Sequence, residues 1–317
     1  MSEKPTTRCP LVSGIRNNPT PSLHKPKPYS TTCNTRRTTI STRNVFFTTG
    51  GLLILGALAT LAYFMFSGAP KVEGDEFWNA SVESNSATID HDLWQDILDE
   101  YLISDDPSGV NLFDYEGLQE SRDTLDEYID TLIDIRPQDY NRAVQQAYWI
   151  NLYNALTVRT ILDEYPVESI TKLGKTALSF GPWDDKVIVV AGKELSLNNI
   201  EHGILRPFWQ DYRVHFAVNC ASIGCPNVQP EAFTAVNSEE LLDLGAQEYL
   251  AHPRGARFEG DTLILSSIFD WYGVDFGNTL PEILSVLATH AEGDLAERLS
   301  TYQGKAKYEY DWDLNSY

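Results

Sequence analysis

The chain has 317 residues, a net charge of −21 at pH 7 and a hydrophobic content of 42%, and it contains seven tryptophans. Residues 1–44 hold eight basic residues and one acid, a charge of +7, which leaves −28 on the remainder. Such an acidic body repels phosphates and argues against DNA or RNA as a partner, while the hydrophobic content argues against general disorder. Four cysteines in this length exclude a disulfide-dense mini-protein.

The first expected element is a run of 23 residues without a charge, residues 45–67. About 20 apolar residues suffice to span the hydrocarbon core of a bilayer. A cleaved signal peptide is the alternative, but its apolar region would be shorter, and Pro70 follows the small residues that a cleavage site needs. We therefore predict one uncleaved transmembrane helix.

The flanking charges predict its orientation, because segments rich in Lys and Arg stay in the cytoplasm. Residues 1–44 are expected to be a disordered basic tail in the cytoplasm. The rest of the chain is then expected to face the periplasm or the exterior, as part of a single-pass protein of the inner or plasma membrane. Residues 68–89 are rich in Gly, Ser, Asn and acids, and we interpret them as a linker.

Residues 90–317 show steady apolar periodicity and are expected to form one domain. Helices are predicted over residues 91–101, 121–135 and 141–164. The third has an apolar stripe with two amides beside it, Asn151 and Asn154. In one interpretation these amides line a substrate pocket, together with Trp149 and with Arg206 further along the chain. In the other they have a structural role: the amides bind backbone loops, and the arginine forms an ion pair.

Shorter elements are expected after residue 186. They are a hairpin around Gly192, a helix that Asn198 begins with Glu201 as its capping-box partner, a strand over residues 214–218, a helix over 237–250, a hairpin around Gly260, a helix over 279–291 and a last strand over 308–314. Helices and hairpins alternate without a regular βαβ pattern. The sequence therefore predicts an α+β domain behind one N-terminal transmembrane helix.

The densest group of polar residues lies between residues 198 and 227. One interpretation makes Cys220 a nucleophile, which needs a histidine that accepts its proton. His202 and His215 are the candidates. On a straight strand His215 and Cys220 would face opposite sides, which favours His202.

A third group would orient the imidazole of such a site, and Glu201, Asn219 and Asn154 are candidates for that role. Backbone N–H groups of residues 221–224 are expected to form an oxyanion hole. Glu201 alternatively serves only as a helix cap.

Two other interpretations use the same cysteines. Cys220 and Cys225 form a disulfide in an oxidising compartment, which would make the domain a non-catalytic binding module. Alternatively, His202, His215, Cys220 and Cys225 bind zinc, although the spacing of these ligands is loose. A buried polar network with inert thiols is the remaining alternative. The sequence implies no cofactor.

Long motifs across residues 90–317 resemble those of the DUF547 family, a domain of unknown function. They are Gln146-Ala-Tyr-Trp149-Ile-Asn151-Leu-Tyr-Asn154, Ile200-Glu201-His202-Gly-Ile-Leu-Arg206-Pro, His215-Phe-Ala-Val-Asn219-Cys220-Ala-Ser-Ile-Gly-Cys225-Pro, Phe269-Asp-Trp-Tyr-Gly-Val-Asp275-Phe and Tyr310-Asp-Trp-Asp-Leu-Asn315.

The resemblance favours Cys220 as a nucleophile over an obligatory disulfide, because related sequences often keep the cysteine that matches Cys220, while the one that matches Cys225 can be serine. Plant members carry the domain beside a coiled coil, which suggests an interaction module. A papain- or transglutaminase-like fold is a tempting analogy, but those enzymes run Cys, His, Asp or Asn, whereas both candidate histidines precede Cys220. The leading hypothesis is a cysteine-dependent hydrolase or acyltransferase that acts on an envelope peptide or protein. The alternative is a scaffold domain.

Overall fold

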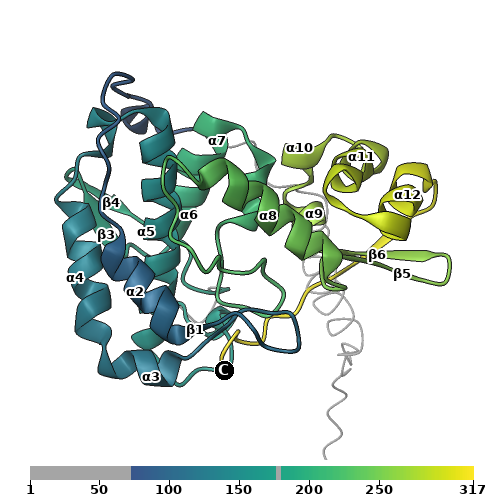
Figure 1. The fold of residues 1–317 in the computed structure, drawn as a ribbon, viewed down its shortest axis with the longest axis horizontal. Helices are drawn as coiled ribbons and strands as arrows, with labels where there is room; N and C mark the ends of the chain where they lie inside the picture. Colours follow the sequence, from purple (N-terminus) through teal and green to yellow (C-terminus); the bar gives the residue numbers. More distant parts are fainter. Residues whose placement is uncertain (1–72, 176–179) are drawn as a thin grey trace, which may run out of the picture. The chain divides into compact units, whose positions relative to one another are not determined.

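The long helix α5, Arg142–Leu162, runs through the larger hydrophobic core of the computed structural model, which describes residues 73–175 and 180–317. Asn141 begins the helix by accepting a hydrogen bond from the N–H of Val144. Most residues of α5 are buried, because α3, α4, α6 and α8 all pack against it (Figure 1). The helix predicted over residues 141–164 is confirmed.

The first part of the domain packs around one side of α5. Helices α3 and α4 contact α5, and α2 contacts α3 and α4. A short antiparallel hairpin, β1 with β2, lies between α2 and α3 in the chain. The bounds are α2 Asp92–Tyr101, β1 Leu102–Ile103, β2 Leu112–Phe113, α3 Tyr115–Glu120 and α4 Arg122–Ile133. The helices predicted over residues 91–101 and 121–135 are confirmed.

Short elements in the middle of the chain lead to the site. The predicted hairpin around Gly192 is formed by β3, Ile188–Val190, and β4, Lys193–Leu195. Helix α6, Leu197–Ile200, a π-helical turn, Glu201–Leu205, and helix α7, Arg206–Trp209, then follow without a break. The predicted capping box is wrong: Ser196 is the N-cap and Asn199 its partner. Glu201 is therefore not a capping residue.

The strand predicted over residues 214–218 is also wrong. The carboxylate of Asp211 accepts a hydrogen bond from the N–H of Arg213 and begins a 3₁₀ helix, Tyr212–Phe216. Val214, His215 and Phe216 are all buried, so the alternation of polar and apolar residues marks no solvent-facing side.

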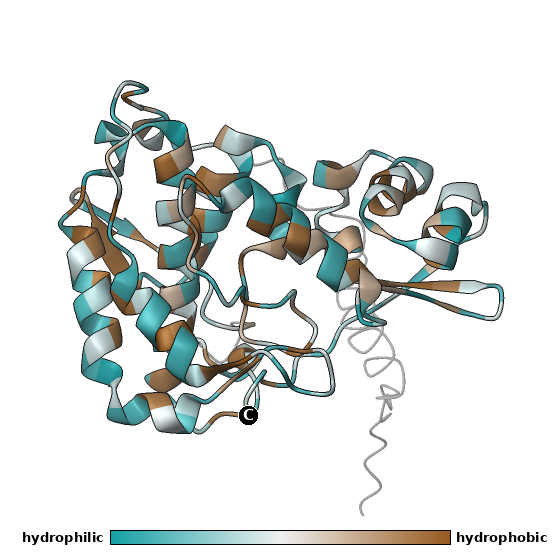
Figure 2. Ribbon diagram, viewed as in Figure 1, coloured by the Kyte–Doolittle hydropathy of each residue, from teal (hydrophilic) through white to brown (hydrophobic). Residues whose placement is uncertain are grey.

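The last part of the domain has its own core. Helix α8 alternates hydrophobic and hydrophilic residues along its length (Figure 2). In a three-stranded sheet, β6 pairs antiparallel with β5, as predicted around Gly260, and parallel with β7. The bounds are α8 Ser238–Ala251, β5 Ala256–Glu259, β6 Thr262–Ser266, α9 Ile268–Trp271, α10 Gly273–Phe276, α11 Leu280–His290, α12 Gly293–Thr301 and β7 Ala306–Glu309.

The helices predicted over residues 237–250 and 279–291 correspond to α8 and α11, whereas the last strand ends earlier than predicted. After β7 the chain returns to the first part of the domain, where the N–H of Phe113 donates to the carbonyl of Asn315 at 2.8 Å. Figure 1 shows the C-terminus close to β1. This return carries residues 310–312 across the site.

The mixture of helices and short strands confirms an α+β fold. Within the predicted linker, residues 68–89, Trp78 is 1% exposed, and its ring meets that of Trp149 edge-on at 5.0 Å, so at least this side chain packs on the domain. The predicted tail, residues 1–44, and span, residues 45–67, lie outside the described residues. Within the described part of the chain, no helix combines the length and apolarity needed to cross a bilayer.

Candidate functional site

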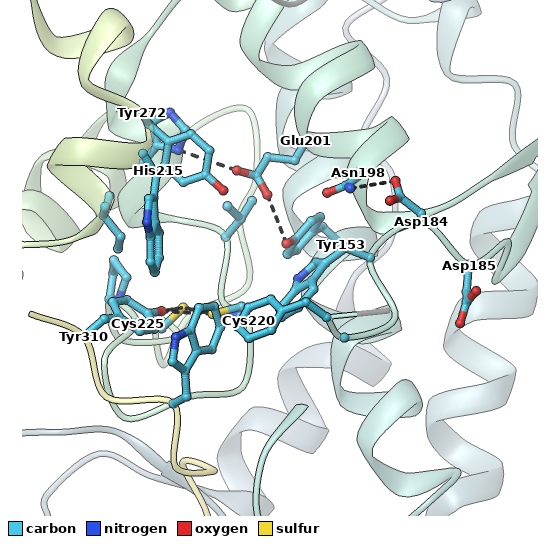
Figure 3. A pocket seen from close by; sticks show the side chains of 18 residues that line it. Tyr153, Asp184, Asp185, Asn198, Glu201, His215, Cys220, Cys225, Tyr272 and Tyr310 are labelled. Carbon is cyan, nitrogen blue, oxygen red and sulfur yellow. Dashed lines mark hydrogen bonds and ion pairs between the residues drawn. The ribbon is translucent and has the colours of Figure 1, made fainter. Parts of the chain in front are cut away.

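One pocket of about 1030 Å³ brings together Glu201, His215, Cys220 and Cys225 (Figure 3). Its volume is at the upper end of ordinary ligand sites, which are about 300–1,000 Å³. Aromatic side chains supply most of the remaining wall: Tyr153, Trp183, Trp271, Tyr272, Tyr310 and Trp312. They come from α5, the loop before β3, the end of α9 and the C-terminal segment, so the pocket depends on the whole domain.

The first wall of the pocket carries the two sulfur atoms. Cys220 is half-buried and Cys225 is buried; both are free thiols, with the Sγ atoms 2.6 Å apart. A disulfide bond is about 2.05 Å long. The backbone N–H of Cys220 donates to the Sγ of Cys225 at 3.0 Å, and the hydroxyl of Tyr310 lies 3.1 Å from the Sγ of Cys220 and 3.3 Å from that of Cys225. The predicted disulfide stays a prediction.

Asn219 and Asn154 hold the loop that presents these sulfurs. The side chain of Asn219 accepts a hydrogen bond from the N–H of Ala221 and donates one to the carbonyl of Pro226. The side chain of Asn154 accepts from the N–H of Asn219 and donates to the carbonyl of Ala217. Ala221 has a φ of 56°, a left-handed conformation that costs energy in a residue with a side chain. The amides therefore enforce a turn that the backbone alone would not prefer.

Gly224 lets the C-terminal segment cross the same loop. A Cβ at this position would lie 2.7 Å from the carbonyl oxygen of Asp311, closer than such atoms approach. The N–H of Gly224 donates to that oxygen, and the N–H of Ile223 donates to the carbonyl of Asp313. The predicted oxyanion hole is therefore wrong for Ala221, Ile223 and Gly224, whose N–H groups are bonded within the protein.

A chain of alternating charges lies at and behind the second wall, where Glu201 and His215 line the pocket. The Nε of Arg206 lies 2.6 Å from Oδ2 of Asp275, and Nε2 of His215 lies 2.7 Å from the same oxygen. Nδ1 of His215 is 3.6 Å from Oε1 of Glu201, whose other oxygen accepts a hydrogen bond from the hydroxyl of Tyr153 at 3.1 Å. The ring of Tyr272 stacks on that of His215 at 4.3 Å. These contacts hold both ring nitrogens of His215 toward carboxylates.

The electrostatics of this wall favour the charged forms. Burial raises the pKa of Glu201, but the neighbouring His202, His215 and Arg206 outweigh it and lower that pKa to about 2. Burial likewise opposes ionisation of Asp275, and hydrogen bonds from His215 and Arg206 lower its pKa to about 2. Burial lowers the pKa of His215, but Asp275 and Glu201 raise it above its usual value. Burial keeps the pKa of His202 below its usual value, so His215 rather than His202 supplies the positive charge beside Glu201.

The two thiols differ in their affinity for a proton. Burial raises the pKa of Cys225, but hydrogen bonds from Cys220 and Tyr310 outweigh it and hold that pKa below its usual value. Burial and the neighbouring Cys225 raise the pKa of Cys220. The two sulfurs therefore titrate as a pair, in which the surroundings favour the thiolate of Cys225 more than that of Cys220.

The structure changes which histidine belongs with Cys220. His215 lines the pocket, whereas His202 does not line it and accepts a hydrogen bond at Nδ1 from the guanidinium of Arg206 at 3.2 Å. The expectation that favoured His202 is wrong because it assumed a strand at residues 214–218. Within the described residues, the hydrogen bonds of the Cys220 sulfur go to Cys225, Ser222 and Tyr310, and none goes to an imidazole.

The four residues expected around a substrate are structural and do not line the pocket. The side chain of Asn151 forms hydrogen bonds with the backbone N–H and carbonyl of Phe233. That of Asn154 bonds the backbone of Asn219 and Ala217, just before Cys220. Trp149 is fully buried in the core, and Arg206 pairs with Asp275. Of the two interpretations left open for the amides, the structure shows that they bind backbone loops.

Sequence reasoning missed several residues of the site that lie about 50 to 90 positions after Cys220 in the chain: Trp271, Tyr272, Asp275, Tyr310 and Trp312. Their signal was their presence in the two C-terminal motifs that resemble the DUF547 family. Among the described residues, no group of three or more His, Cys, Asp or Glu side chains is arranged to hold a metal ion. The zinc arrangement considered for His202, His215, Cys220 and Cys225 is not formed.

The structure is therefore that of an α+β domain with two cysteines in its pocket. Residues 137–250, which include α5, Glu201, His215 and both cysteines but not Asp275, match the family model described as "Protein of unknown function, DUF547". Searches of curated proteins and of solved structures found no match to this chain. The family description states no activity, so the site itself has to carry the functional argument.

Proposed function

We propose that this domain is a thiol-dependent enzyme that hydrolyses or transfers the acyl group of a peptide-like amide, with Cys220 as the nucleophile. The observation that carries the proposal is the shared pocket: a half-buried thiol on one wall and a carboxylate-bound imidazole on the other. A reactive cysteine usually occurs where neighbouring groups stabilise a thiolate and where a ligand can reach it.

Cys225 is the proton acceptor that the geometry offers. In the first step Cys225 is the thiolate. The Sγ of Cys220 attacks the carbonyl carbon, the carbonyl oxygen takes up the electron pair of the C=O π bond, and the proton of Cys220 passes to the Cys225 thiolate, 2.6 Å away. The tetrahedral intermediate then breaks its C–N bond, and the leaving amine takes the proton from Cys225. Water, or an amine in a transfer reaction, next attacks the thioester. This attack breaks the C–S bond and returns a proton to the cysteine pair.

The second wall would stabilise the reacting group without changing its own charge. Burial raises the pKa of Tyr272 well above its usual value, so its hydroxyl stays neutral and can donate a hydrogen bond. That hydroxyl has no protein partner among the described residues, and Figure 3 shows it near the Glu201 carboxylate. The pairing of His215 with Asp275 and Glu201 fixes the stacked Tyr272 ring. We assign Tyr272 as a donor to the carbonyl oxygen of the substrate.

Trapping the covalent intermediate tests this function. Incubation of the reduced protein with p-nitrophenyl acetate should release a burst of p-nitrophenol and leave one acetyl group on Cys220, located by peptide mass spectrometry. The Cys220→Ser variant should show no burst, whereas the matched control Ser300→Ala, at an exposed serine of α12 outside the pocket, should keep it. Acetylation that is spread over lysines, or a burst that survives in Cys220→Ser, would refute a Cys220 nucleophile.

Thiol–disulfide exchange is a second candidate, favoured by the 2.6 Å between the sulfurs. Here the Cys220 thiolate attacks a substrate disulfide, and Cys225 displaces the mixed disulfide. The substrate is thereby reduced to two thiols and the pair is oxidised to a disulfide. The Cys225→Ser variant separates the candidates: it should lose exchange with a peptide disulfide entirely, but keep part of any acyl transfer.

We also propose that residues 45–67 anchor the domain to a membrane and place it outside the cytoplasm, where an envelope protein or peptide would be its substrate. The support is the uncharged run and the basic segment before it. Carbonate extraction of membranes from expressing cells, followed by protease treatment of intact cells or spheroplasts, tests both points. The domain should stay with the membrane and be digested from outside.

A further inference from the structure

The pocket combines indole rings with acids, and two of the indoles, those of Trp271 and Trp312, pack on Tyr310 beside the sulfurs. Trp183, Trp312 and Trp271 are half-buried and form a continuous band, with ring centroids 5.6 Å apart for the first pair and 5.5 Å for the second. The three come from segments far apart in the sequence, the loop before β3, the C-terminal segment and the end of α9. Large aromatic faces that line a cavity gain binding free energy when a ligand covers them and displaces the water from their surface.

Two carboxylates stand beside this band. Asp184 accepts a hydrogen bond from the amide of Asn198 at 2.8 Å, and the carboxylate of Asp185 accepts none from a described residue. Neither makes an ion pair within the described part of the chain. Figure 3 shows both on the opposite side of the pocket from Tyr310 and Cys225. Of the residues that line the pocket, none is Lys or Arg.

This combination favours a cation over a neutral ligand. Indole faces attract ammonium and guanidinium groups through their negative π-systems, and the attraction grows where water is excluded. Unpaired carboxylates add a charge-assisted hydrogen bond for the same group. The strongly acidic body around the pocket further raises the local concentration of cations. A neutral sugar would also stack on indole, but it would leave both carboxylates without a counter-charge.

We propose that the pocket binds its ligand through a basic side chain, lysine or arginine of a peptide, which lies against Trp183, Trp312 and Trp271 and pairs with Asp184 and Asp185. The identity of this ligand as a substrate rests on the proposed function, with the reacting carbonyl at Cys220. The binding of the cation does not rest on it.

Equilibrium binding to the Cys220→Ala variant of the full chain tests the proposal, because this variant cannot turn a substrate over. The probes are the peptides acetyl-Ala-Lys-Ala-amide and acetyl-Ala-norleucine-Ala-amide, which differ by the ammonium group alone, and the neutral disaccharide N,N′-diacetylchitobiose. Tryptophan fluorescence follows binding. The lysine peptide should bind about tenfold tighter than the norleucine peptide, and added NaCl should reduce the difference.

A double substitution locates the site. Asp184→Asn with Asp185→Asn should raise the Kd of the lysine peptide about tenfold and leave that of the norleucine peptide unchanged. The matched control, Asp123→Asn with Asp130→Asn, removes two charges from the exposed face of α4 outside the pocket and should change neither. Thermal unfolding monitored by circular dichroism shows that each variant is folded.

Equal affinity for the two peptides, no binding of either at millimolar concentration, tighter binding of the disaccharide, or an equal loss in the α4 control would each overturn the proposal. This assay measures binding and needs no catalysis. If the acetylation test fails and the lysine peptide still binds as expected, the domain binds cations but is not a thiol enzyme. The reverse pair of results would leave a thiol enzyme with a different substrate.

Discussion

The two walls of the pocket satisfy their polar atoms in different ways. On the charged wall each ion faces an opposite one, from Arg206 through Asp275 and His215 to Glu201. On the sulfur wall, one hydroxyl, that of Tyr310, lies within 3.3 Å of both sulfurs and of the Ser222 hydroxyl. A fully paired buried network is rigid, whereas neighbouring thiol and hydroxyl groups can pass a proton from one to another. Under the proposed function, the sulfur wall would carry the chemistry and the charged wall would position it.

The largest expected effect separates chemistry from stability on the sulfur wall. Cys220→Ser should lower the rate of acyl transfer by about 10³-fold or more, because the serine hydroxyl stays protonated at this site. The free energy of unfolding should change by less than about 1 kcal/mol, since the half-buried side chain keeps its size. Assays of activity and urea unfolding on the same preparation measure both. A variant that keeps its activity would move the chemistry away from this wall.

The opposite pattern is expected on the charged wall. Asp275→Asn removes the partner of two buried cations and should lower the free energy of unfolding by about 3 kcal/mol. The matched control Asp270→Asn, an exposed residue nearby, should change it by less than about 0.5 kcal/mol. Urea unfolding compares the two variants with the parent chain. Small and equal losses in the two variants would show that the ion pairs of Asp275 contribute little to the free energy of unfolding.

The pH dependence of stability sharpens the same comparison. Glu201 and Asp275 have pKa values of about 2 in the folded protein, whereas a carboxyl group in the unfolded chain has a pKa of about 4. Their ionised forms therefore stabilise the fold fully when the pH is above about 4, and this stabilisation is lost as the pH falls from about 4 to about 2. His215, whose pKa is raised, contributes fully below about 6.5 and loses its contribution as the pH rises through its folded pKa. The stability lost in His215→Gln should therefore be greatest between about pH 4.5 and 6.5. A loss that is greatest above pH 8 would contradict a cationic His215.

A smaller effect is expected from the amide that shapes the sulfur loop. Asn219→Ala removes the acceptor for Ala221 and the donor to Pro226, and it should cost about 1–2 kcal/mol of unfolding free energy. Acyl transfer should fall about tenfold with little change in KM, because the sulfur is misplaced while the pocket persists. Asn151→Ala, which loses two similar backbone contacts away from the pocket, is the matched control for stability. An equal loss of activity in both variants would indicate a general loss of structure.

The sequence predicted what depends on local pattern and missed what depends on long-range packing. The apolar stripe of α5 and the turn at Gly192 were sufficient to place those elements. The pattern around His215 did not predict its structure, because a buried 3₁₀ helix and a half-buried strand can show the same alternation of polar and apolar residues. That error also moved the imidazole choice to His202.

The site was predictable only in part for the same reason. Glu201, His215 and Cys220 fall within 20 residues of one another, so their clustering was visible in the sequence. Tyr310 and Trp312 reach the pocket through the returning C-terminal segment, and Asp275 of α10 reaches His215. No local pattern encodes these paths.

The rate at which iodoacetamide alkylates Cys220 tests the central claim most directly. In the reduced, folded chain at pH 7, Cys220 should react faster than N-acetylcysteine, because Cys225 accepts its proton, and the adduct should lie on Cys220, because Cys225 is buried. The Cys225→Ser variant should slow that reaction. A rate no higher than that of N-acetylcysteine, or an adduct on Cys225, would contradict the account.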